Sequence, residues 1–292
     1  MSPSNRLEPI DADHRPRSSN VWFQTLFGLY TGVLVAGFVT AVATLQAVSS
    51  AALAGIYLIG FAGGFLAGIA AARIDGTLAI RLGRSRVRRA SLSVPAAPFG
   101  AVAVASWWLS LESALSLVAT VSAAGLLVLG YVVAELARTR YVDAVVAADP
   151  VDSWWWTPPR AGRAYTLVAL GWLFMVIASA ANGNWTAAAA WIVIVLGWIV
   201  AGIIEGRWRI EWGVRPEIRV YENGFVKRRP FTETFVPWAD VSHVRLRDDE
   251  LVLDRGLFDV RLERSELEDL EAVRDAIERT RPNATGRNRT AD

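Results

Sequence analysis

The chain has 292 residues, 53% of them hydrophobic, and a mean hydropathy of +0.32, which excludes an ordinary water-soluble protein and is typical of a membrane protein. A formal net charge of only +2 gives no reason to expect a nucleic-acid partner. The absence of cysteine excludes disulfides and cysteine-ligated metals, and with only two distant histidines, His14 and His243, we expect no metal or other cofactor.

Six apolar runs follow a polar N-terminal tail, residues 1–20, which we expect to be disordered and cytoplasmic. Each run is long enough to cross about 30 Å of hydrocarbon, and the centre of none carries an ionisable residue. Because only a helix satisfies every backbone polar group within one segment in lipid, we expect six transmembrane helices within residues 21–204. The runs cover residues 22–46, 51–72, 92–111, 114–136, 164–181 and 187–204.

Arginines alternate between the loops that connect these runs. The N-terminal tail and the second and fourth loops carry several, whereas loops 47–50, 112–113 and 182–186 carry no Lys or Arg. Positive charge stays on the cytoplasmic side, so the sequence predicts three antiparallel hairpins in the cell membrane with both termini in the cytoplasm. A cleavable signal peptide is the alternative for the first run, but the long polar tail before it favours a retained span.

Small residues form ridges on the first two runs. Such ridges allow two helix backbones to approach closely. We expect them to pack the helices of one chain together, and a homo-oligomer interface is the alternative. The residues concerned are Gly28 and Gly32 in the first run and Gly60, Gly64 and Gly68 in the second.

The second loop is strongly basic. Residues 73–90 read RIDGTLAIRLGRSRVRRA, in which six arginines accompany a single Asp75. The topology signal alone explains these arginines, and contact with anionic lipid headgroups is the functional alternative. The candidate contact residues are Arg81, Arg84, Arg86, Arg88 and Arg89.

Three consecutive tryptophans, Trp154, Trp155 and Trp156, precede Pro158 and Pro159 in the fourth loop. Adjacent helical residues point about 100° apart, so three neighbouring indoles cannot share one helical face. We therefore expect an irregular segment that anchors the loop at the headgroup level, where an indole gains from an apolar body and a wet N–H. Docking of the C-terminal domain onto these indoles is the second interpretation, and a substrate role is the third.

The pattern changes from continuous apolar runs to alternation after Ile204. Short alternating segments are separated by turn signals, of which Asn223-Gly224 is the strongest. About six or seven short strands result if Trp208, Ile210 and Trp212 form the first of them. Ser265 and Glu268 fit a capping box that would begin a helix, and the apolar face of this helix would consist of Leu267, Leu270, Val273 and Ile277. Trp238 and Phe258 are expected in the core. We expect one domain over residues 205–281 and a disordered tail over 282–292.

Two short stretches in this region carry a resemblance to a known family. Tyr221-Glu222-Asn223-Gly224 and Trp238-Ala239-Asp240-Val241, in the order strand, turn, strand, two hairpin strands and helix, resemble a prokaryotic PH-like domain of the YcxB-like type. The resemblance covers about a quarter of the chain and implies a small β-barrel or sandwich capped by one helix. It also implies a scaffold for lipid or protein contacts without shared catalytic residues. The most basic run of the domain, Lys227, Arg228 and Arg229, is its candidate contact site.

Together these features predict an α-helical integral membrane protein that displays a PH-like module in the cytoplasm. We expect it to be non-enzymatic and to contact membrane lipids or a cytoplasmic protein partner. A transporter or channel is the alternative, with a polar path along Thr31, Thr40, Thr44, Ser116, Thr120 and Ser122. A membrane enzyme would have to use Glu112, Glu135 and Asp143, which form no recognised motif.

Overall fold

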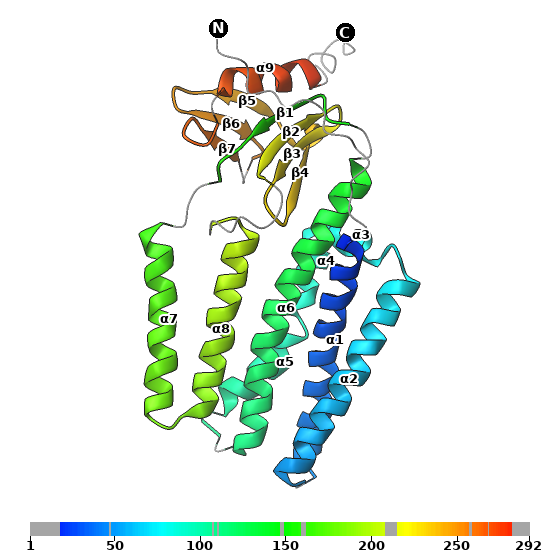
Figure 1. Ribbon diagram of the computed structural model, residues 1–292, viewed down its shortest axis with the longest axis vertical. Coiled ribbons are helices and arrows are strands. Elements are labelled where there is room, and N and C mark those ends of the chain that lie inside the picture. Colours follow the sequence, from blue (N-terminus) through cyan, green and yellow to red (C-terminus); the bar gives the residue numbers. More distant parts are fainter. Residues whose placement is uncertain are drawn as a thin grey trace, which may run out of the picture. The chain divides into compact units, whose positions relative to one another are not determined.

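The computed structural model describes residues 18–46, 48–106, 108–109, 111–146, 149–158, 162–207, 215–256, 259–267 and 269–281 (Figure 1). The chain divides into two compact units, each discontinuous in sequence. Among the described residues, the helical unit contains those between 18 and 141 and between 162 and 203, whereas the unit that holds the strands, here called the β domain, contains those between 142 and 158 and between 204 and 281. The second part of the β domain begins at residue 204, next to the predicted boundary at residue 205, but the domain also includes the segment before α7, which the prediction placed in the transmembrane part.

Five helices of the helical unit are long and apolar enough to cross a membrane. They match the first, second, fourth, fifth and sixth predicted runs, so five of the six runs are confirmed as helices of spanning length and composition. Their bounds are Ser18–Thr44 for α1, Ser50–Ile74 for α2, Ser113–Val145 for α6, Arg163–Ala181 for α7 and Trp185–Ile204 for α8.

The third predicted run does not form one long helix, so the structure does not reproduce the count of six. Its α-helix, α5, covers only Ala96–Ala105 and rises about 15 Å, half of what a span needs. A 3₁₀ turn, η2 (Ser91–Ser93), and Pro95, which lacks a backbone N–H, separate α5 from the short α4 (Arg86–Ala90). The other short helix, α3, covers Leu78–Gly83.

Contacts nevertheless trace the direction of this third run. The Tyr30 hydroxyl donates to the carbonyl oxygen of Leu92 at 2.9 Å, and a β-carbon on Gly130 of α6 would lie 2.9 Å from the same oxygen. Fourteen residues later, the Ser106 hydroxyl lies 3.0 Å from that of Ser116, near the start of α6. The run therefore lies antiparallel to α6.

The glycine ridges lie where α1 meets α2. A β-carbon on Gly28 would lie 2.9 Å from Ile69, and one on Gly60 would lie 3.1 Å from the backbone of Ala36. The Thr31 hydroxyl donates across the same contact to the carbonyl oxygen of Gly64 at 2.8 Å. The glycines thus let two helix backbones meet within this chain. Gly32 and Gly68 are part of the same contact.

Aromatic side chains take the place of glycine between α7 and α8. Tyr165 stacks on Trp198 with ring centroids 4.5 Å apart, and its hydroxyl donates to the Trp198 carbonyl oxygen at 2.8 Å. Trp172 stacks on Trp191 at 5.2 Å. These rings hold the two backbones apart, so this hairpin is bulkier than the first.

The β domain contains two antiparallel sheets. Sheet A has the order β1-β2-β3-β4, and sheet B has the order β5-β6-β7. Its first strand, β1, contains two of the three tryptophans and pairs with β2 through Trp154 opposite Ile218. The bounds are Asp152–Trp155 (β1), Glu217–Tyr221 (β2), Gly224–Arg228 (β3), Glu233–Pro237 (β4), His243–Leu246 (β5), Glu250–Asp254 (β6) and Val260–Glu263 (β7), with a 3₁₀ turn, η3, at Trp238–Asp240.

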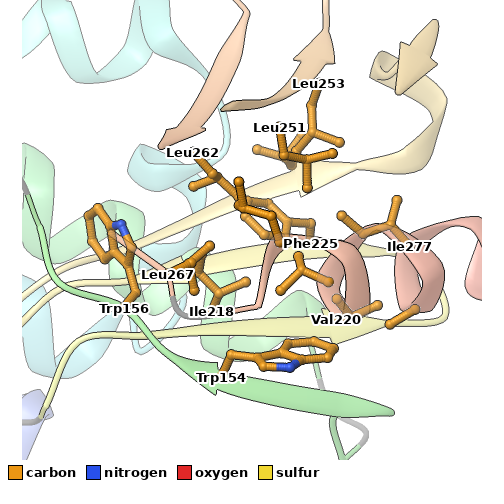
Figure 2. Packing of buried hydrophobic residues seen from close by; sticks show 14 of the residues in the cluster. Trp154, Trp156, Ile218, Val220, Phe225, Leu251, Leu253, Leu262, Leu267 and Ile277 are labelled. Atoms are coloured by element: carbon orange, nitrogen blue, oxygen red, sulfur yellow. The ribbon is translucent and has the colours of Figure 1, made fainter. Parts of the chain in front are cut away.

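Strand alternation gives sheet A an inner face that lies in the main core (Figure 2). Val220 and Phe225 are fully buried there together with Leu251 of sheet B and Ile277 of the C-terminal helix. The alternating strands and the Asn223-Gly224 turn are confirmed. Trp238 is buried as expected, whereas Phe258 and the proposed strand at Trp208–Trp212 lie outside the described residues.

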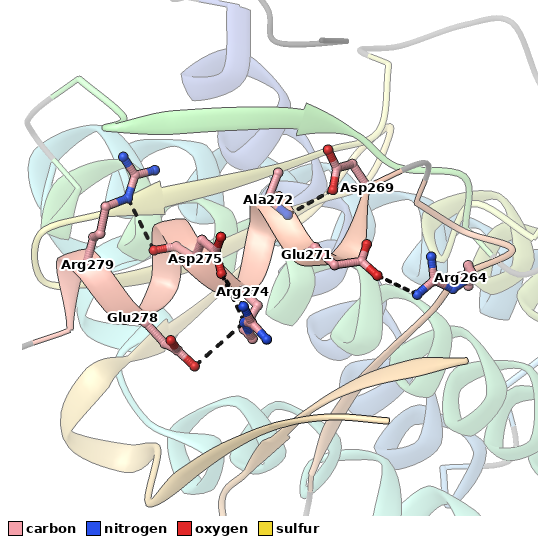
Figure 3. A network of polar contacts seen from close by, with 8 residues as sticks. All are labelled: Arg264, Asp269, Glu271, Ala272, Arg274, Asp275, Glu278 and Arg279. Carbon is pink, nitrogen blue, oxygen red and sulfur yellow. Dashed lines mark hydrogen bonds and ion pairs between the residues drawn. The ribbon is translucent and has the colours of Figure 1, made fainter. Parts of the chain in front are cut away.

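The C-terminal helix, α9, covers Leu270–Thr280 and closes the core with the predicted apolar face. Its N-cap is Asp269, whose carboxylate accepts from the Ala272 N–H at 2.8 Å (Figure 3). The predicted capping box at Ser265 is wrong, because the Ser265 hydroxyl donates to Glu263 and the helix begins after Asp269. Glu268 lies outside the described residues.

The exposed face of α9 carries ion pairs along its length. Arg264 pairs with Glu271 at 2.7 Å, and Arg274 pairs with Asp275 and Glu278 (Figure 3). Exposed pairs of this kind contribute little each, so α9 is held mainly by its apolar face.

Candidate functional site

Cationic and aromatic side chains meet at one end of the β domain, which we call the basic rim. It consists of Trp155, Trp156, Arg215, Lys227 and Arg229. The Arg215 guanidinium carbon lies 5.6 Å from the Trp155 ring centroid. The Lys227 ammonium lies 3.9 Å from the Trp156 centroid, and the Arg229 guanidinium carbon lies 5.9 Å from it. Cations at these distances over an indole face are attracted by its negative quadrupole.

Lys227 is the only lysine of the chain, and its side chain is half-buried. Burial lowers its pKa to about 8, while the nearby Glu266 carboxylate acts in the opposite direction. Glu266 is itself held in place, because it accepts the Trp156 indole N–H at 2.9 Å. The Trp156 ring therefore links the basic side chain to the loop that precedes α9.

The rim is also where the chain leaves the β domain and returns to it. Pro158 follows β1 and leads toward α7, whereas Gly206 follows α8 and leads toward β2. A β-carbon on Gly206 would lie 3.1 Å from Pro230, in the β3–β4 turn, and 3.6 Å from Pro158. Gly206 also has a φ of +70°, which favours glycine. Both junctions are thus at the rim.

The structure corrects the interpretation of the tryptophan triplet. Trp154 and Trp156 are only 6% and 2% exposed and lie in the core of the β domain, so they cannot anchor an irregular loop in headgroups (Figure 2). They occupy alternate positions of an extended segment, which lets both point inward while Trp155 points to the other face. The second interpretation, contact with the C-terminal domain, holds in a stronger form, because the triplet is part of that domain.

The structure separates Arg228 from the two other basic residues of its run. It lies on the outer face of sheet A, opposite to Lys227, and pairs with Glu217 at 2.8 Å and with Glu233 at 3.0 Å. Arg219 pairs with the same Glu217. Arg228 is thus engaged in a partly buried ion-pair network, and Lys227 and Arg229 remain as rim residues.

The outer face of sheet A is covered by the last turn of α6. Val142 and Val146 pack against Tyr221 and Val226 in a small cluster of their own, which Phe235 borders. The Asn223 side-chain amide donates to the carbonyl oxygen of Val145 at the end of α6, at 3.4 Å. The β domain therefore begins at Val142 and has a core on each face of sheet A.

The arginines of the basic second loop have local partners. Arg81 pairs with Asp75 at 2.9 Å, and Arg88 donates to the Arg81 carbonyl oxygen at 3.1 Å. Arg89 is half-buried and donates to the carbonyl oxygen of Gly83 at 2.6 Å. Burial lowers the pKa of Arg89, and the nearby Arg138 lowers it further. The loop is thus folded, with Arg84 and Arg86 exposed.

No protein-family model, curated protein or solved structure matches this chain. Among the described residues, no three His, Cys, Asp or Glu side chains form a group that could hold a metal ion. The site therefore has to be interpreted from its own geometry.

The residues of the two alternative functions are dispersed. Glu135 pairs with Arg138 at 3.5 Å, and Asp143 lies eight residues further along α6, about 12 Å away along the axis. The Ser116 and Thr44 hydroxyls bond to Ser106 and to the Ala41 carbonyl. Thr40 and Ser122 are buried, and neither hydroxyl oxygen has a partner among the described residues.

Sequence reasoning missed Arg215, Glu266 and the strand that holds the tryptophans. Arg215 lies next to the segment 208–214, which the structure does not describe, and Glu266 shows no pattern in the sequence. The strand did leave a signal, because Asp152, Trp154 and Trp156 alternate with Ser153 and Trp155, and tryptophan favours strands.

Proposed function

We propose that this protein is a non-enzymatic, multi-pass membrane protein whose cytoplasmic β domain contacts anionic lipid at the inner membrane surface through the basic rim. One observation carries the proposal. The cations Arg215, Lys227 and Arg229 gather at the end of the domain where the chain leaves for α7 and returns from α8.

The short connections between the β domain and helices α7 and α8 support a position of the rim close to the membrane. Only residues 159–162 separate Pro158 from the start of α7, and Gly206 comes two residues after the end of α8. An extended chain spans at most about 3.5 Å per residue, so the first of these connections covers less than about 20 Å. A basic side chain that comes within about one Debye length, about 10 Å, of an anionic bilayer contributes about 1 kcal/mol of attraction.

The proposed topology has six crossings with both termini in the cytoplasm. The arginine-rich loops, the antiparallel course of residues 92–106 beside α6 and the exposed Trp108 and Trp185 at the opposite loops support it. In this topology the short α5 and the 3₁₀ turn before it make the third crossing.

The β domain is proposed to be PH-like. The two strands that flank the Asn223-Gly224 turn, a second sheet after Trp238–Asp240 and one closing helix follow each other in the order that the resemblance implies. The departure is the position of β1, which is separated from β2 by the entire α7–α8 hairpin.

The test uses the full-length protein in nanodiscs of neutral lipid or of neutral lipid mixed with phosphatidylglycerol that carries a photoreactive headgroup. The triple change Arg215→Gln, Lys227→Gln, Arg229→Gln removes three charges from the rim. With about 1 kcal/mol for each, it weakens the contact by about 3 kcal/mol, and crosslinking to β1 and to the β3–β4 turn falls to background.

The matched control changes three exposed arginines of sheet B to glutamine, namely Arg245, Arg247 and Arg261. This variant has the same net charge as the rim variant and should crosslink like the unchanged protein. Equal crosslinking of the two variants would overturn the proposal. So would a rim that crosslinks in cells to a protein and not to lipid, which would assign the rim to a protein partner.

A further inference from the structure

The turn between β3 and β4 carries an exposed phenylalanine. Among the described residues of the β domain, the large hydrophobic side chains that are exposed are Val151 and Phe231. Phe231 is 38% exposed and lies at the tip of the turn, directly after Pro230. Val151 lies at the other end of sheet A, where its N–H donates to the carbonyl oxygen of Val220 just before the β2–β3 turn. Single exposed hydrophobic residues are common on protein surfaces, so the position of Phe231 has to decide its role.

The β3–β4 turn is closed and rigid. The Arg229 N–H donates to the carbonyl oxygen of Thr232 at 2.8 Å, which joins the two ends of the turn. Pro230 fixes φ at the second position of the turn. The Thr232 side chain is buried, whereas Phe231 beside it stays exposed. A side chain held on a rigid turn loses little conformational entropy when it binds a surface.

This turn packs against the end of a membrane helix. A β-carbon on Gly206 would lie 3.1 Å from the Pro230 ring and 3.6 Å from that of Pro158. Gly206 comes two residues after Ile204, the last residue of α8, and the first charged residue after this helix is Glu205. Two residues span at most about 7 Å. The turn therefore contacts the chain within about 7 Å of the point where an apolar helix ends.

We propose that the β3–β4 turn inserts Phe231 into the boundary between the headgroups and the acyl chains of the inner leaflet. The insertion rests on the proposed contact between the basic rim and anionic lipid, and it adds an apolar contact that salt does not screen. The flanking cations Lys227 and Arg229 would stay at the level of the headgroups, because long basic side chains keep their charge in water while their stems lie along apolar surface.

Lipid is the partner that this arrangement favours. An apolar tip beside basic residues is complementary to an anionic bilayer, which presents negative headgroups above hydrocarbon. The turn is also held close to the end of α8, where the bilayer surface would lie, by the contact of Pro230 with Gly206. Phe231 would thus give the β domain a third attachment to the membrane, besides the connections to α7 and α8.

The first test measures the depth of position 231 in the full-length protein in nanodiscs that contain phosphatidylglycerol. The chain has no cysteine, so Phe231→Cys can carry a nitroxide label without background, and Val151→Cys is the matched control. Oxygen concentrates in hydrocarbon and a nickel chelate in water. We expect a clearly higher ratio of oxygen to nickel collisions at position 231 than at position 151. Equal ratios at the two positions would overturn the insertion.

A second measurement needs no label on the protein, since a nitroxide is itself apolar. Phosphatidylglycerol with a photoreactive group in its acyl chain should crosslink to the β3–β4 turn. Phe231→Ser removes the apolar tip and should lower this crosslinking about fivefold, whereas Phe231→Leu should retain it. Val151→Ser is the matched control and should crosslink at this turn like the unchanged protein. Crosslinking that persists in Phe231→Ser, or that falls as much in Phe231→Leu, would contradict the insertion.

Headgroup crosslinking on the same preparations separates this inference from the proposed function. If acyl-chain crosslinking is absent while headgroup crosslinking still depends on the rim charges, the insertion alone is wrong. If headgroup crosslinking is equal in the rim variant and its sheet B control, the proposed function is wrong. In that case the acyl-chain measurement still decides the insertion by itself.

Discussion

The inner and outer faces of sheet A are built from alternate residues of the same strands, yet they differ in chemistry. The inner face packs Val220 and Phe225 in a dry core with sheet B and α9. The outer face carries Glu217, Arg219 and Arg228 beside a small apolar cluster that includes the end of α6.

This difference indicates that the two faces contribute differently to the stability of the domain. An apolar core is insensitive to pH and supplies most of the folding free energy. A partly buried network of ion pairs contributes little net stability, because the cost of removing its charges from water offsets their attraction. We infer that the inner face holds the domain together, whereas the outer face adds a smaller contact with the end of α6.

The largest expected effect comes from removing the part of the domain that precedes α7. A fragment of residues 205–281 lacks Trp154, Trp156 and the last turn of α6. Each buried tryptophan is worth about 3–5 kcal/mol, and a domain of this size has about 5–15 kcal/mol in total. We expect this fragment to show no cooperative unfolding transition, whereas one that joins residues 142–158 to 215–281 by a flexible linker should. Cooperative unfolding of the shorter fragment would show that β1 is dispensable.

Single substitutions in the triplet come next. Trp154→Ala empties a site in the inner core and should lower the opening free energy of β2 and β3 by about 3–5 kcal/mol, measured by native-state hydrogen exchange. Trp155→Ala is the matched control from the adjacent, half-buried position and should cost about 1 kcal/mol or less. Equal losses from the two variants would contradict the assignment of faces.

The outer apolar cluster should respond more weakly and more locally. Val142→Ala and Val146→Ala each remove two buried carbons, worth about 1.5 kcal/mol. Exchange should accelerate at the end of α6, while the amides of β1 keep their protection. A global loss of protection would mean that the two cores unfold as one, and the comparison between the faces would fail.

The smallest expected effect concerns Lys227, the cation at the margin of the inner face. Because burial lowers its pKa to about 8, its positive charge is lost as the pH rises from about 7 to about 9. Crosslinking of the rim to anionic lipid should then fall about fivefold, the equivalent of about 1 kcal/mol. Lys227→Arg keeps its charge and should not change over this range. A parallel decline in that variant would mean that another group titrates.

Much of the fold could be predicted from the sequence where a single local pattern decides the structure. Uninterrupted apolar length gave five long helices, and alternation with Asn223-Gly224 gave the strands of residues 217–263. The prediction of one long helix for the third run was wrong, because the length of an apolar run does not reveal that Pro95 and a 3₁₀ turn interrupt the helix.

The domain boundary and the rim could not be predicted in the same way, because they depend on contacts between distant segments. Trp154 pairs with Ile218 although two helices, α7 and α8, separate them in the sequence. No local sequence pattern predicts such a pairing. The basic run at residues 227–229 looks uniform in sequence, yet the strand turns Arg228 to one face and Lys227 to the other.

The central claim is that the tryptophan segment is the first strand of the β domain and not a loop at the lipid surface. Hydrogen exchange of the backbone amides of residues 151–156 in the full-length protein tests this most directly. Val151 and Trp156 donate to the carbonyl oxygens of Val220 and Pro216, so these amides should exchange as slowly as those of β2. Exchange at the rate of an unstructured loop, with β2 still protected, would contradict the account.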